Sequence, residues 1–166
     1  MNILRFRLLL VTTMLLLALQ PVTTVFAAKP EVFTFHNEGS FTIDCGSFLA
    51  VEEFVEDVRV MVFFNKAGDP VRVVTHVNYT GIITNPETGR TLRDPGHHKV
   101  VEDLENGTLA FIGLVYGITV PGEGIAVLDA GRVIFDGEAI EENVIFEAGP
   151  HQYLHGGDAV ICAALD

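Results

Sequence analysis

Two adjacent histidines, His97 and His98, precede the carboxylate of Glu102, and His151 follows near the end of the chain. Imidazole nitrogens and carboxylate oxygens are ligands that suit zinc, iron or manganese. If these side chains met in one pocket, they could hold such a metal for catalysis. Neighbouring residues of a strand point to opposite faces, so His97 and His98 line the same pocket only if the backbone bulges.

The segments around these histidines, "HHKVVE" and "AGPHQYLH", resemble the metal-binding motifs of cupins. The resemblance implies a small barrel in which His97 or His98 binds a metal together with Glu102 and His151. Cupins separate their first two histidines by one residue, whereas here Lys99 stands where the second would fall. A metal-dependent, cupin-like enzyme is therefore the alternative interpretation, and the preferred one predicts no cofactor.

Residues 1–27 have the layout of a secretory signal peptide. A basic start leads into the apolar run Leu8–Leu19, and Val25-Phe26-Ala27 resembles a cleavage site. The run is shorter than the roughly 20 apolar residues that a transmembrane helix needs. We therefore expect residues 28–166 to form a single extracellular domain without a stable membrane anchor.

The chain contains two cysteines, Cys45 and Cys162. In an oxidising compartment an even number of cysteines indicates a disulfide, so we expect these two to pair. Closing a loop of that length contributes roughly 4–5 kcal/mol to stability in the chain-entropy model. The alternative, a nucleophilic thiol within "DCGS", lacks the motif that surrounds the cysteine of papain-like proteases.

The net charge of −12 at pH 7 argues against a nucleic-acid partner, which needs a basic surface. It also argues against binding to anionic membranes. The simpler interpretation of this charge is solubility, and the sharper one is attraction of cations or basic partners.

The run from Glu52 to Asp57 is expected to form a solvated face, and His76 to face solvent. Asp129 stands in an apolar strand and is expected to be paired there.

Val, Ile, Phe and Thr dominate the chain beyond the leader, with Gly and Pro between the apolar stretches, which is typical of strands and turns. Val71–Ile83 alternates with a period of two, and Ala159–Leu165 is also predicted as a strand. Phe48–Val58 is the only predicted helix, with a short turn leading into the strand as the alternative for its first part. Gly113 and Gly117 indicate bulges, and Asn106-Gly107 predicts a type I′ hairpin turn. These elements predict an all-β antiparallel meander, with a small β-barrel preferred over a two-sheet sandwich.

Standard enzyme signatures, such as the Gly-x-Ser-x-Gly elbow and His-Glu-x-x-His, are absent from the sequence. The C-terminal half, from "VPGEGIAVLDAGRVIFDG" to Cys162, resembles small secreted bacterial proteins of unassigned function. That resemblance implies export and an all-β domain, without implying a reaction. We therefore expect a non-catalytic binding module for a small apolar ligand or a surface partner.

Overall fold

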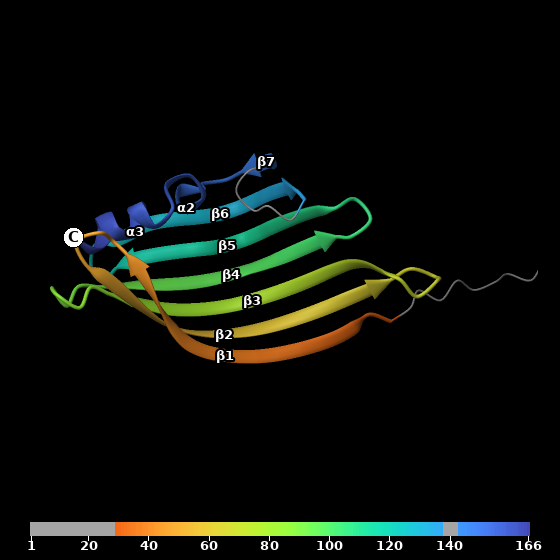
Figure 1. Ribbon diagram of the computed structural model, residues 1–166, viewed down its shortest axis with the longest axis horizontal. Helices are drawn as coiled ribbons and strands as arrows, with labels where there is room; N and C mark the ends of the chain where they lie inside the picture. The colour runs from red at the N-terminus through yellow and green to blue at the C-terminus, as the bar shows by residue number, and fades with distance from the viewer. Residues whose placement is uncertain (1–28, 138–142) are drawn as a thin grey trace, which may run out of the picture.

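The computed structural model describes residues 29–137 and 143–166, so the predicted signal peptide lies outside the described residues. Seven strands lie side by side in one antiparallel sheet and follow each other in chain order (Figure 1). They are β1 (Glu31–Asp44), β2 (Leu49–Phe64), β3 (Pro70–Thr84), β4 (Thr91–Asp103), β5 (Thr108–Val120), β6 (Gly124–Asp136) and β7 (Val144–Ala148). Two short helices, α2 (Gln152–Gly156) and α3 (Asp158–Leu165), follow the sheet. The predicted antiparallel meander is confirmed.

One face of the sheet, here called the inner face, packs against the two helices at one end. Inner-face residues and residues of α3 share a single core, which consists of Ile43, Phe48, Ala50, Ile83, Leu92, Ile118, Val127, Ile161 and Leu165. The alternation predicted for β3 is confirmed, because Val77, Tyr79 and Ile83 are more buried than His76 and Asn78 on the opposite face. His76 is exposed, as expected.

Two secondary-structure predictions were wrong. Phe48–Val58 is not a helix, because β2 pairs along its length with β1 on one side and β3 on the other. Pairing on both edges outweighs the helix preference of its glutamates. Ala159–Leu165 is a helix rather than a strand, because Ile161 and Leu165 are four residues apart and both buried. Residues at that spacing lie on one face of a helix.

The sheet remains open. Among the described residues no strand ladder joins β1 to β7, so the preferred β-barrel is not confirmed. The chain instead returns through α2 and α3, and its C-terminus lies beside the end of β1 (Figure 1). There the sulfur atoms of Cys45 and Cys162 lie at disulfide distance, with Cα atoms 5.4 Å apart. The predicted cysteine pair therefore connects the end of β1 to α3.

The hairpin between β4 and β5 forms where it was predicted, but its turn is not type I′. That turn needs positive φ at both central residues, and among the described residues only glycines have positive φ. Gly107 has a φ of 66°, while Asn106 keeps a negative one. The Asp103 carboxylate accepts the backbone N–H groups of Glu105 and Asn106 at 3.1 and 3.0 Å, which shapes a longer loop.

No helix within the described ranges is long and apolar enough to cross a membrane.

Candidate functional site

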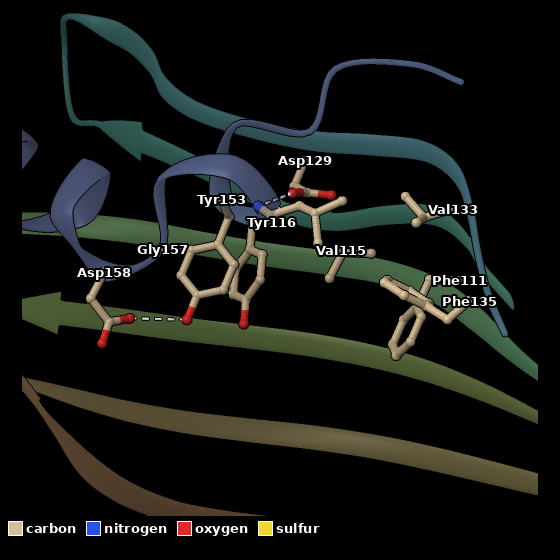
Figure 2. A pocket seen from close by; sticks show the side chains of 10 residues that line it. Phe111, Val115, Tyr116, Asp129, Val133, Phe135, Tyr153, Gly157 and Asp158 are labelled. Atoms are coloured by element: carbon tan, nitrogen blue, oxygen red, sulfur yellow. Dashed lines mark hydrogen bonds between the residues drawn. The ribbon is translucent and has the colours of Figure 1, made fainter. Parts of the chain in front are cut away.

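A pocket of about 630 Å³ lies between the inner face of β5 and β6 and the C-terminal helices (Figure 2). The residues that line it are Phe111, Val115, Tyr116, Asp129, Val133, Phe135, Tyr153, Leu154, Gly157 and Asp158. Figure 2 shows the phenylalanine rings at one end and the two tyrosines at the other. The pocket therefore has an apolar end and a polar end.

A bulge in β5 gives the pocket its floor. The register between β5 and β6 shifts between Leu114 and Tyr116, so Val115 is the extra residue. Strict alternation would place Val115 and Tyr116 on opposite faces, yet both line the pocket. Gly113 precedes the bulge with a φ of 120°, and a Cβ there would lie 2.6 Å from the His97 carbonyl oxygen. The bulge indicated by Gly113 in the sequence is therefore present.

A buried pair holds α2 over β6. Nδ1 of His151 lies 3.0 Å from Oδ1 of Asp129, and both residues are only 5% exposed. The other Asp129 oxygen accepts the backbone N–H of Leu154, also at 3.0 Å. Asp129 is thus paired, as the sequence predicted for a carboxylate in an apolar strand. These contacts fix the helix segment that carries Tyr153 and Leu154 into the pocket.

The polar end of the pocket consists of two tyrosines and a carboxylate. The rings of Tyr116 and Tyr153 pack with their centroids 4.2 Å apart. The Tyr153 hydroxyl donates a hydrogen bond of 2.9 Å to Oδ1 of Asp158 (Figure 2). Burial, with smaller contributions from Asp94 and other carboxylates, raises the pKa of Tyr116 to about 12. Both hydroxyls therefore keep their protons at neutral pH.

The apolar end is formed by aromatic and branched side chains from β5 and β6. Phe111 and Phe135 pack edge to face, with ring centroids 6.0 Å apart. Val133 and Phe135 are almost fully buried. His98 on β4 packs beside Phe111, with ring centroids 6.2 Å apart. Burial lowers the pKa of His98, so this imidazole is neutral at pH 7.

Two buried carboxyl groups lie on the inner face beyond Tyr116. Glu52 on β2 is 2% exposed and accepts the Tyr79 hydroxyl at 2.7 Å. Asp94 on β4 is 1% exposed, and neither of its oxygens has a hydrogen-bond partner within the described residues. Burial and, to a smaller extent, the nearby charge of Glu52 together raise the pKa of Asp94 to about 7. The backbone N–H of Gly117 lowers the pKa of Asp94, although it does not reach hydrogen-bond geometry with either carboxylate oxygen.

A glycine makes room for this carboxyl pair. Gly81 on β3 lies opposite Asp94 in the sheet. A Cβ at Gly81 would come within 2.1 Å of Oε1 of Glu52. The expectation that the run from Glu52 to Asp57 forms one solvated face was therefore wrong for Glu52. Alternation along β2 places Glu52 on the inner face and Glu53 on the outer one.

The histidines singled out in the sequence lie apart. His97 and His98 face opposite sides of the sheet, and His97 contacts the Asn78 side chain on the outer face. His98 shares the inner face with Glu102, but four residues along a strand span about 13 Å. His151 is engaged with Asp129. No three His, Cys, Asp or Glu side chains of the described ranges lie close enough together to hold a metal ion.

The pocket residues Tyr116, Tyr153 and Asp158 were not recognised from the sequence. Tyr116 lies in a stretch with apolar residues at both odd and even positions, so the alternation of side chains could not assign Tyr116 to a face of the sheet. Tyr153 and Asp158 lie in a segment with few strand or helix signals. The one usable signal was Asp129, a lone carboxylate in an apolar strand, which does line the pocket.

Comparison with protein-family models, curated proteins and solved structures found no match to this chain.

Proposed function

We propose that the protein is a non-catalytic binding module that holds a small apolar ligand in the inner-face pocket. The observation that carries this proposal is the pocket itself, which has an apolar wall of Phe111, Val133 and Phe135 and a volume of about 630 Å³. Pockets for small molecules commonly occupy about 300–1,000 Å³ and combine apolar walls with a few polar groups. Burying the ligand against this wall supplies the main favourable term.

The tyrosines at the other end support a ligand that also carries one polar group. A hydroxyl or carbonyl placed there would lie beside the hydroxyls of Tyr116 and Tyr153, which can donate or accept a hydrogen bond. A hydrogen bond to these hydroxyls fixes the orientation of the ligand in the pocket. The simplest binding site for an apolar ligand would be a closed cavity without polar groups. This pocket differs from it, because the hydroxyls of Tyr116 and Tyr153 lie at one end.

The leader and the cysteines support a place of action outside the cell. Residues 1–27 have the layout of a signal peptide, and Cys45 and Cys162 lie at disulfide distance. Disulfides persist in oxidising compartments, so both features agree with an exported protein. We therefore propose that the ligand is taken up from the extracellular medium.

Filling the pocket with a larger side chain should weaken ligand binding. We expect Nile red, a neutral apolar dye that fluoresces in apolar surroundings, to brighten and saturate when residues 28–166 are added. Val115→Trp and Leu154→Trp should each weaken this binding about tenfold or more, because the indole occupies the ligand's space. The two positions come from different elements, so one variant remains informative if the other folds poorly.

The matched control is Ile82→Trp, which adds the same indole on the outer face, where Ile82 is exposed. Circular dichroism should show the same β-sheet spectrum for all variants. Equal Nile red affinity in the wild type and both pocket variants would show that the dye does not bind in this pocket, and the proposal would fail.

A further inference from the structure

The charged residues that line the pocket are all acidic. Two of the ten described lining residues, Asp129 and Asp158, are carboxylates, and none is Lys, Arg or His. The Asp129 carboxylate is already engaged by His151 and the Leu154 N–H. Asp158 is exposed and accepts one hydrogen bond from Tyr153 through Oδ1. A carboxylate can accept further hydrogen bonds, so Asp158 can also meet a donor on a ligand.

Aromatic rings surround the same space. Phe111, Tyr116, Phe135 and Tyr153 all line the pocket. Tyr153 stands next to Asp158, and Tyr116 packs on the other side of the Tyr153 ring (Figure 2). The face of an aromatic ring carries partial negative charge and attracts an ammonium group placed over it. A carboxylate beside aromatic faces is therefore a favourable environment for an organic cation.

Behind the lining, Asp94 is about half ionised at pH 7, because burial raises its pKa to about 7, and this partial charge adds to the negative potential. Asp94 and Glu52 lie on the inner face beyond Tyr116, and their charges help to raise the pKa of Tyr116, after burial as the main cause. The nearest imidazole, His98, is kept neutral because burial lowers its pKa. The net charge of the chain, −12 at pH 7, has the same sign. An anionic ligand would meet repulsion on entering, and a cation would meet attraction.

We infer that the ligand is a hydrophobic amine, bound as its ammonium ion with the charged group at Asp158 and the tyrosines and the apolar part on Phe111 and Phe135. This inference rests on the proposed function and assigns the chemical class of its ligand. The ammonium donates to the Asp158 carboxylate and lies against the aromatic rings, while the hydrocarbon part fills the far end.

Three compounds with the same eight-carbon chain test this directly: octylamine, octanol and octanoate. Each competes with Nile red for residues 28–166 at pH 7, below its micelle-forming concentration. Octylamine should displace the dye at about tenfold lower concentration than octanol, because cation–π and charge attraction add to the shared apolar contact. Octanoate should be the weakest of the three.

Asp158→Asn removes the charge while keeping an oxygen that can accept the Tyr153 hydroxyl. It should reduce the octylamine preference over octanol severalfold and leave octanol unchanged. The matched control is Asp57→Asn, which removes one charge on the outer face, where Asp57 pairs with His36. Its octylamine preference should stay at the wild-type value.

The outcomes separate the two proposals. Failure of Nile red to bind would refute the binding function itself. Nile red binding with equal competition by all three compounds, or with octanoate as the strongest, would overturn the amine assignment alone. An Asp158→Asn variant that keeps the full octylamine preference would also overturn it, as would an equal loss in Asp57→Asn.

Discussion

Replacing Cys45 or Cys162 with serine should lower the free energy of unfolding by about 5 kcal/mol. The two cysteines are separated by 117 positions in the sequence. In the chain-entropy model, removing a crosslink that closes so long a loop raises the conformational entropy of the unfolded chain. This lowers the free energy of unfolding by about that amount. Urea denaturation of the oxidised wild type and of each variant, at the same pH, measures the difference.

The double variant Cys45→Ser/Cys162→Ser provides the control, because it lacks the same single crosslink as each of the single variants. Its stability should match that of either single variant to within about 1 kcal/mol. Loss of the crosslink should also accelerate amide hydrogen exchange more in α3 than in β3 to β5, because Cys162 connects that helix to the end of β1. Unchanged midpoints in all three variants, or two free thiols in the denatured wild type, would contradict the bridge.

The second large effect comes from Asp94. Its pKa is near 7 in the folded protein, chiefly because of burial, compared with 3.8 for a solvated aspartate. The folded state therefore binds a proton more tightly than the unfolded state does, and stability should fall as pH rises from about 4 to about 7. A shift of this size corresponds to about 4 kcal/mol. The raised pKa of Glu52 acts in the same direction.

Asp94→Asn is neutral in both states and should flatten this decline, so the variant should be more stable than the wild type at pH 8. Urea midpoints at intervals between pH 4 and 8 give the comparison. Asp103→Asn is the control, because Asp103 is only partly buried and hydrogen bonds from Asn106 and its neighbour lower its pKa. That variant should keep the wild-type decline. Parallel curves for the wild type and Asp94→Asn would show that Asp94 is not a buried acid.

Much of the fold follows from local pattern. The period of two in β3 identified both the strand and its buried face, since a half-buried strand must alternate. The turn at Asn106-Gly107 was located correctly, but its type depends on how the Asp103 carboxylate folds the loop. Phe48–Val58 was misread because pairing on both edges, a long-range effect, decides its conformation.

The site was less predictable because it is assembled from residues far apart in the chain. Tyr116 reaches the pocket through a bulge in β5, and Tyr153 reaches it because His151 is anchored to Asp129. No spacing rule connects such positions. The same holds for Glu52 and Asp94, which meet only because the sheet brings β2 and β4 to either side of Gly81.

The most direct test of the ligand pocket is methyl NMR of residues 28–166 carrying labelled valine and leucine, titrated with Nile red. We expect the methyl signals of Val115, Val133 and Leu154 to shift together and to saturate at one equivalent of dye. Val32 on β1 and Val55 on β2 are exposed apolar residues on strands away from the pocket, and their signals should stay in place. Shifts confined to Val32 and Val55, with the three pocket residues unchanged, would contradict binding in this pocket.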